Sequence, residues 1–126
     1  MRRLLIPIAF VLLLGGAGSA PAGIEGPTTI GVRNGASEFS FSLSRTKVES
    51  GPAIIQYQNT GEDPHDLKIR RKGGDEILEI GVTQPGVAQA LAVDRLKGDS
   101  IYKLWCSLEG HAEAGMKAKI GVARRR

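Results

Sequence analysis

The sequence predicts an all-β domain, a β-sandwich of Greek-key type. From residue 23 onward, short runs rich in β-branched and aromatic residues alternate with Gly, Pro, Asn and Asp. No long segment repeats apolar residues at the spacing of a helix. Several short strands separated by frequent turns fit two packed sheets in a single domain of roughly a hundred residues.

Three strands are predicted in the first half of this domain. Residues 28–32 are largely β-branched and precede the turn dipeptide Asn-Gly. Residues 38–43 alternate two Phe and one Leu with Ser, and residues 53–58 place Ile and Tyr on one face, so both runs predict half-buried strands. Turn-forming residues at 46–51 and 59–64 separate or end these runs.

Five further strands are predicted in the second half. Residues 67–71 and 77–82 flank a Gly-Gly-Asp turn and alternate apolar with polar side chains. A Gln-Pro-Gly turn leads to residues 87–93, where Ala side chains on one face fit a closely packed strand, although Ala also favours a helix. Residues 100–106 and 117–122 complete the predicted sheets.

A secretory signal peptide is predicted at residues 1–22. Two Arg follow the initiator Met, an apolar run covers residues 4–14, and small residues lead to the cleavage pattern Ala20-Pro21-Ala22. We therefore expect a mature domain of residues 23–126 in the periplasm, at the cell surface or outside the cell. An uncleaved membrane anchor is the alternative, but the apolar run is shorter than the roughly 20 residues that span a bilayer.

Charge and cysteine content exclude some classes of protein. The full chain has 17 basic and 13 acidic residues, and without Arg2 and Arg3 the count is 15 against 13, a net charge of +2. This balance does not indicate a nucleic-acid-binding protein. A single Cys can form no internal disulfide, so its thiol is free, paired between molecules, or occupied by a ligand such as a metal.

The soft metal ligands of the chain are concentrated in residues 106–116. This stretch contains the single Cys, one of the two His and the only Met apart from the initiator. The second His is isolated upstream, at position 65. A thiolate, two imidazoles and a thioether form the donor set that holds type 1, or blue, copper. We expect one metal site with the ligands His65, Cys106, His111 and Met116.

Two other kinds of chemistry use similar residues. Zinc also binds Cys and His, but copper is favoured by the affinity order of the divalent metals. A Cys106–His111 nucleophilic pair would need an exposed thiol and a third, orienting group, whereas the strand before Cys106 places its sulfur at the buried end of a sheet. A copper oxidase or nitrite reductase needs additional His-rich copper sites. We therefore expect no enzymatic activity.

The motifs of this chain resemble those of the cupredoxins, the plastocyanin- and azurin-like blue copper proteins, over nearly the whole of residues 23–126. The segments that carry the resemblance are Asn59-Thr60-Gly61, Pro64-His65-Asp66, Tyr102-x-x-Trp105-Cys106-Ser107 and Gly110-His111 to Gly115-Met116. The resemblance implies a cupredoxin-like sandwich, one type 1 copper ion on the four ligands, and transfer of one electron between redox partner proteins, with the edge of His111 facing solvent.

We expect the protein to be a monomer. A membrane redox complex to which it docks is among the expected partners. An extracytoplasmic copper carrier or buffer protein with the same ligands is the alternative function. A third possible function is that of a metal-free interaction module.

The ligand stretch departs from the better-known cupredoxins. Four residues separate Cys106 from His111, and four more separate His111 from Met116. Asp66 follows the upstream His where Asn is more usual. We expect its carboxylate to tie the two ligand loops together as a hydrogen-bond acceptor. As a sharper hypothesis, an ionised Asp66 favours Cu(II) over Cu(I).

Overall fold

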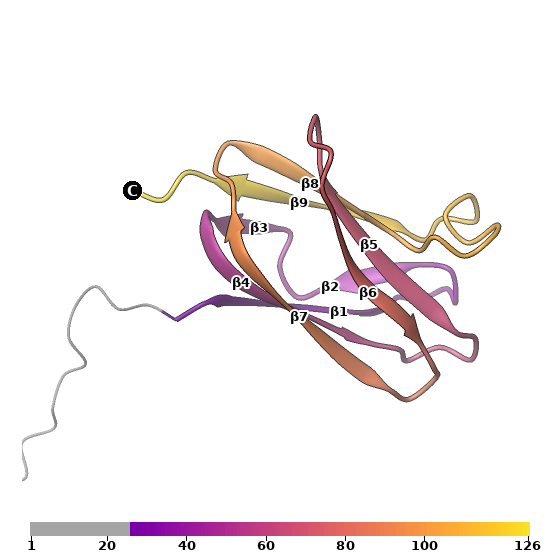
Figure 1. The fold of residues 1–126 in the computed structure, drawn as a ribbon. Coiled ribbons are helices and arrows are strands. Elements are labelled where there is room, and N and C mark those ends of the chain that lie inside the picture. The colour runs from indigo at the N-terminus through magenta and orange to yellow at the C-terminus, as the bar shows by residue number, and fades with distance from the viewer. Residues whose placement is uncertain (1–25) are drawn as a thin grey trace, which may run out of the picture.

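The computed structural model describes residues 26–126, which form two facing β-sheets (Figure 1). No helix occurs in this part of the chain, so the all-β prediction is confirmed. Accordingly, residues 26–126 contain no helix with the length and apolar character needed to cross a membrane. The predicted signal peptide, residues 1–22, lies outside the described residues.

Nine strands make up the two sheets between residues 26 and 126. In chain order they are β1 (Thr28–Asn34), β2 (Phe41–Leu43), β3 (Lys47–Glu49), β4 (Gly51–Gln58), β5 (His65–Arg71), β6 (Ile77–Thr83), β7 (Ala88–Leu96), β8 (Ser100–Trp105) and β9 (Lys117–Ala123).

The chain crosses repeatedly between the sheets, as expected for a Greek-key sandwich. One sheet has the strand order β2-β1-β4-β7, and the other has the order β3-β9-β8-β5-β6. The pairs β1–β4 and β3–β9 are parallel, and the remaining pairs are antiparallel. Some strands adjacent in sequence, such as β4 and β5, therefore lie in different sheets, and the connecting loops gather at the ends of the sandwich.

The core lies between the sheets and is built by alternation along the strands. Side chains at every second position of β1, β4, β5, β8 and β9 point inward and most are buried, while most of their neighbours are more exposed. The fully buried members include Ile30, Ile55, Tyr57, Leu67 and Ile69. This packing fixes the strands that carry the ligand loops.

Two predicted elements in the first half were wrong in detail. The strand expected at 38–43 is extended only over β2, because residues 35–40 form a turn. The Gly35 amide donates to the Ser40 carbonyl oxygen at 3.0 Å, and Asn34 Nδ2 donates to the Glu38 carbonyl oxygen at 3.0 Å. The segment 46–51 was expected to be a turn but contains β3, which pairs with β9. The ambiguous run 87–93 is a strand, within β7.

Three loops that are distant in sequence meet at one end of the sandwich, at the right of Figure 1. They are residues 35–40 between β1 and β2, residues 59–64 between β4 and β5, and residues 106–116 between β8 and β9. The four predicted metal ligands belong to the second and third of these loops or directly follow them. This end of the molecule is therefore where a metal centre would form.

We expect Ile69→Ala to lower the free energy of unfolding by about 2–5 kcal/mol, because it leaves a cavity in the middle of β5. Ile69 is 0% exposed and pairs in register with Leu104 and Leu78. Urea unfolding measures the change. Ile101→Ala is the control, since Ile101 is 43% exposed and should change stability by no more than about 0.5 kcal/mol. Equal losses in the two variants would contradict this description of the core.

Candidate metal centre

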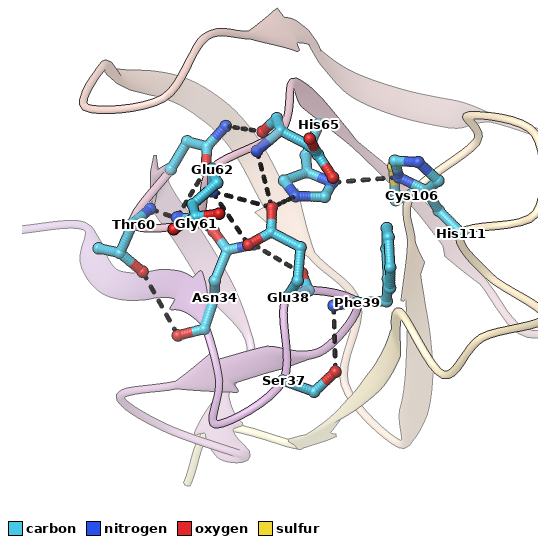
Figure 2. A network of polar contacts seen from close by, with 12 residues as sticks. Asn34, Ser37, Glu38, Phe39, Thr60, Gly61, Glu62, His65, Cys106 and His111 are labelled. Atoms are coloured by element: carbon cyan, nitrogen blue, oxygen red, sulfur yellow. Dashed lines mark hydrogen bonds and ion pairs between the residues drawn. The ribbon is translucent and has the colours of Figure 1, made fainter.

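Three of the predicted ligands come together at the end of the sandwich. His65 is the first residue of β5, Cys106 directly follows β8, and His111 lies within the loop 106–116. Their ligating atoms all lie within 4.8 Å of one another. The two Nδ1 atoms of the imidazoles are 3.1 Å apart, and Cys106 Sγ lies 3.5 Å from His111 Nδ1. Figure 2 shows the two rings and the sulfur converging.

The site is buried on one side and reaches the surface on the other. His65 and Cys106 are both 0% exposed, whereas His111 is only partly buried. Two donors are thus shielded from water by the sandwich, and the third forms the boundary with solvent. This placement agrees with the expectation that the edge of His111 faces outward.

Met116 lies at the base of the ligand loop and is 0% exposed. Its amide donates to the carbonyl oxygen of His111, and its own carbonyl oxygen accepts from the amide of Cys106, both at 3.1 Å. The backbone of Met116 therefore contacts both downstream ligands and closes the loop. Its role as the axial ligand stays a prediction.

The rest of the loop 106–116 is a series of tight turns. The amide of His111 donates to the Leu108 carbonyl oxygen at 3.1 Å, and the amide of Ala114 donates to the Gly110 carbonyl oxygen at 3.1 Å. Gly110 and Gly115 have φ angles of 79° and 117°, a region that residues with a side chain rarely adopt. Glycine at these two positions permits the loop to double back and return to β9.

A carboxylate that was not predicted as part of the site contacts the buried imidazole. Glu38 Oε1 lies 2.7 Å from His65 Nε2 (Figure 2). When His65 Nε2 carries the proton and donates it to Glu38, the lone pair of Nδ1 faces His111 and Cys106. A partner of this kind fixes the tautomer and the orientation of a metal-binding His.

The same carboxylate also holds the loop that leads to His65. Glu38 accepts hydrogen bonds from the amides of Glu62 at 3.0 Å and Asp63 at 2.9 Å. These two backbone hydrogen bonds, with a smaller contribution from His65, hold the pKa of the Glu38 carboxyl below its usual value, so the group is ionised at neutral pH. The close approach requires glycine at position 61, where a Cβ would lie 2.4 Å from Glu38 Oε1.

Asp66 ties β5 to the ligand loop. Its Oδ1 accepts from the Ser107 amide at 2.6 Å, and its Oδ2 accepts from the Ser107 hydroxyl. Asp66 is 4% exposed, and Lys68 Nζ lies 4.0 Å from Oδ2. The expectation that Asp66 joins the two ligand loops as an acceptor is confirmed. The tie runs between the residue after His65 and the residue after Cys106, so it fixes these two ligands relative to each other.

An aromatic side chain from the turn 35–40 covers both imidazoles. The ring centroid of Phe39 lies 4.8 Å from that of His111 and 6.1 Å from that of His65, both in edge arrangements. Such contacts restrict the rotation of the imidazoles and remove water from the site. Phe39 and Glu38 are adjacent, so one short turn supplies both the polar and the apolar support of His65.

Two buried amides hold the surrounding loops. Asn34 Oδ1 accepts from the Tyr57 hydroxyl at 3.0 Å and from the Thr60 amide at 3.1 Å. Asn59 Nδ2 donates to the carbonyl oxygens of Asp63 and Thr83, both at 2.8 Å. Between residues 26 and 126, every buried side-chain nitrogen or oxygen has a hydrogen-bond partner. The polar support of the site is therefore complete before any metal binds.

Burial raises the pKa of the Cys106 thiol, and backbone hydrogen bonds from Asp66 and Leu108 act in the opposite direction. In the absence of a metal the thiol is therefore protonated at neutral pH. A metal that binds here must displace that proton.

The donor set fits a soft or borderline transition metal. A thiol and two imidazoles at mutual distances of a few ångströms match a site with two nitrogen ligands and one sulfur ligand. The contact from Glu38 to His65 and the tie from Asp66 to Ser107 provide the outer hydrogen bonds that such ligands need.

No protein-family model matches this chain, and no curated protein matches it either. Solved structures do match its fold. An auracyanin from the photosynthetic bacterium Roseiflexus castenholzii is 18% identical with a TM-score of 0.65, over 78% of this chain and 99% of that one.

Two further solved structures have the same fold. Auracyanin A, described as a "blue" copper protein from Chloroflexus aurantiacus, is 16% identical with a TM-score of 0.63, over 77% of this chain and 99% of that one. Rusticyanin from Thiobacillus ferrooxidans is 20% identical with a TM-score of 0.61, over 78% and 79%. At these identities the likeness establishes the fold, and this chain has the cupredoxin fold.

The sequence indicated the four candidate ligands but not Glu38 or Phe39. Both were placed in a strand because the run 38–43 alternates apolar and polar residues. The Asn-Gly pair at 34–35 and the serines that follow are turn-forming residues, and they were the signal that residues 35–40 leave the sheet. Nothing in the sequence alone indicates that Glu38 reaches His65, because Glu38 lies in the turn between two strands of one sheet and His65 begins a strand of the other.

We expect Gly61→Ala to displace the Glu38 carboxylate, because the new methyl group would occupy its place. His65 would then lose the partner of Nε2. ¹⁵N NMR of the metal-free protein should show a single Nε2–H tautomer of His65 in the wild type and a mixture in the variant.

Glu38→Ala should give the same mixture of tautomers. Gly81→Ala is the matched control, since a Cβ at position 81 meets no atom within 4 Å. An unchanged His65 tautomer in both Gly61→Ala and Glu38→Ala would show that Glu38 does not orient the ring.

Proposed function

We propose that this chain is an exported, single-copper electron-transfer protein that holds one type 1 copper ion and carries one electron between redox partners. The observation that carries the proposal is the convergence of a fully buried Cys with two His in a cupredoxin fold. Solved structures with this fold include a protein described as a "blue" copper protein.

His65, Cys106 and His111 would hold the copper ion, and Met116 is the proposed axial ligand. Bound copper supplies a one-electron Cu(II)/Cu(I) couple, and a mixed imidazole, thiolate and thioether set is a compromise between the preferences of the two oxidation states. Zinc could use the same Cys and His ligands. The affinity order of the divalent metals supports copper.

The chain's own contribution is to keep the donors in place. Glu38 orients His65, the Asp66–Ser107 tie holds Cys106 beside β5, and Phe39 packs against both imidazoles. A site fixed in this way undergoes little rearrangement when one electron enters or leaves. The partly buried His111 is the proposed contact point for redox partners, because it is the ligand at the molecular surface.

The burial of the donors supports electron transfer over copper carriage. A carrier must release its ion to an acceptor, and release is hindered when two of the ligands are 0% exposed. We propose that the protein transforms no substrate. We also propose that residues 1–22 direct export, that the protein is a monomer and that it docks to a membrane redox complex.

The metal-free protein should take up one equivalent of Cu(II) and turn blue, with an intense visible absorption from charge transfer between the Cys106 thiolate and copper. Electron paramagnetic resonance of the same sample reports the type 1 site. Cys106→Ser should abolish the absorption, while Ser107→Ala should retain it. A colourless complex of the wild type with Cu(II) would refute the proposal.

Asp66→Asn should raise the reduction potential of the copper-loaded protein, on the order of tens of millivolts, because it removes a negative charge that favours Cu(II). The amide oxygen of Asn can still accept from the Ser107 amide, so the tie is partly preserved. Cyclic voltammetry measures the potential. Glu109→Gln is the matched control, since Glu109 is exposed and its charge is screened by solvent. An unchanged or lower potential in Asp66→Asn would contradict this role of the carboxylate.

A further inference from the structure

A groove on the outer face of the five-stranded sheet is lined by cations around an apolar floor. Its volume is about 620 Å³, and it lies over β5, β8 and β9. We call it the basic groove. Its apolar lining residues are Leu104, Trp105, Ala112 and Ala118, of which Leu104 is buried in the core and Trp105 is partly exposed, and its four cations are Arg70, Lys103, Lys117 and Lys119.

The strand register places three of these cations directly opposite one another. Arg70 on β5 is opposite Lys103 on β8, and Lys103 is opposite Lys119 on β9. In the next row, Trp105 lies between Lys68 and Lys117. Like charges at directly opposite positions of antiparallel strands destabilise a sheet. Folding alone therefore gives no reason for this row of three positive charges.

The four cations of the groove are not neutralised by the chain. Within residues 26–126, no carboxylate oxygen lies within 4.0 Å of their charged nitrogens, whereas Lys68 in the same sheet is paired with Glu79. All four side chains are exposed. The groove thus presents uncompensated positive charge even though the net charge of the chain is small.

The basic groove adjoins the metal centre. Trp105 is the residue before Cys106, and Ala112, which also lines the groove, is the residue after His111. The guanidinium carbon of Arg70 lies 5.9 Å from the centroid of the Trp105 ring. A molecule seated in the groove would contact the residues next to two of the proposed copper ligands.

We propose that the basic groove is the docking surface for a redox partner protein that presents carboxylates around an apolar side chain. The inference rests on the proposed function, because it assigns that partner a place on this chain. An apolar centre that contains Trp, within a polar or charged rim, is the arrangement typical of protein interfaces. Opposite charge on the partner would speed association and fix its orientation.

Other anionic surfaces fit these observations less well. A lipid surface cannot enter the concave groove, whereas a single side chain of a partner protein can. Residues 23–126 have a net charge of only +2, whereas proteins that bind nucleic acids usually present a broad, strongly basic surface. Both remain outcomes of the test below.

The test uses the metal-free, ¹⁵N-labelled protein and a synthetic peptide that alternates Glu and Leu. We expect the peptide to shift the amide resonances of β8 and β9 around Trp105, with an affinity that falls as salt is added. Vesicles of phosphatidylglycerol and duplex DNA are the comparison probes. Shifts centred elsewhere, or binding to vesicles or DNA without binding to the peptide, would overturn the proposal.

Lys103→Glu separates a binding role from a structural one. The substitution places a carboxylate opposite both Arg70 and Lys119, so it should raise the melting temperature by about 2–6 °C. The same substitution should weaken peptide binding about tenfold or more. A gain in stability combined with a loss of binding is expected only if the row of cations serves a partner.

Arg33→Glu is the matched control, because Arg33 is exposed on the other sheet, opposite the uncharged Ser42 and Gln58. It changes the net charge equally and should leave peptide binding unchanged. Equal weakening by both variants would show a non-specific charge effect and overturn the proposal. Since the measurements use metal-free protein, their failure leaves the copper proposal intact, and failure to bind copper leaves the peptide result intact.

Discussion

The contact between Glu38 and His65 is the interaction on which the proposed metal centre most depends. A fully buried imidazole needs a partner for its Nε2–H, because an unpaired buried donor is costly. Glu38 supplies that partner and, in the same position, accepts the amides of the loop that leads to His65. One carboxylate therefore sets the direction of the Nδ1 lone pair and the path of the backbone, and glycine at position 61 is needed because the carboxylate occupies the space of a side chain.

The remainder of the site follows from hydrogen bonds that join strands and loops distant in the sequence. Asp66 connects β5 to Ser107 of the ligand loop, Asn34 connects β1 to the loop 59–64, and Asn59 connects that loop to β6. Each connection is a hydrogen bond to backbone, so the geometry is set before a metal arrives. The outer face of the five-stranded sheet, in contrast, contains an arrangement of side chains that disfavours folding. There, three cations lie in one row at a cost in stability, and we propose that the basic groove they border serves a partner.

Much of this arrangement could be predicted from the sequence, for identifiable reasons. Period-two alternation located most strands, since each has one face on the core, and the scarcity of Cys, His and Met singled out the four candidate ligands. Asp66 was correctly assigned as the tie between the ligand loops. Glu38 and the row of Arg70, Lys103 and Lys119 were not predictable, because both depend on which strands become neighbours. In a Greek-key sandwich, neighbouring strands are often far apart in the sequence. The local sequence pattern therefore does not indicate which strands pair.

We propose that the fold holds the copper ligands in place before copper binds. Crystal structures of the metal-free and Cu(II)-loaded protein test it most directly. We predict that the donor atoms of His65, Cys106 and His111, and the Glu38–His65 and Asp66–Ser107 contacts, occupy the same positions in both, with the ion between them. Rearrangement of the loops 59–64 or 106–116 on metal binding, or an ion bound by other residues, would show that the fold does not hold these ligands in place beforehand.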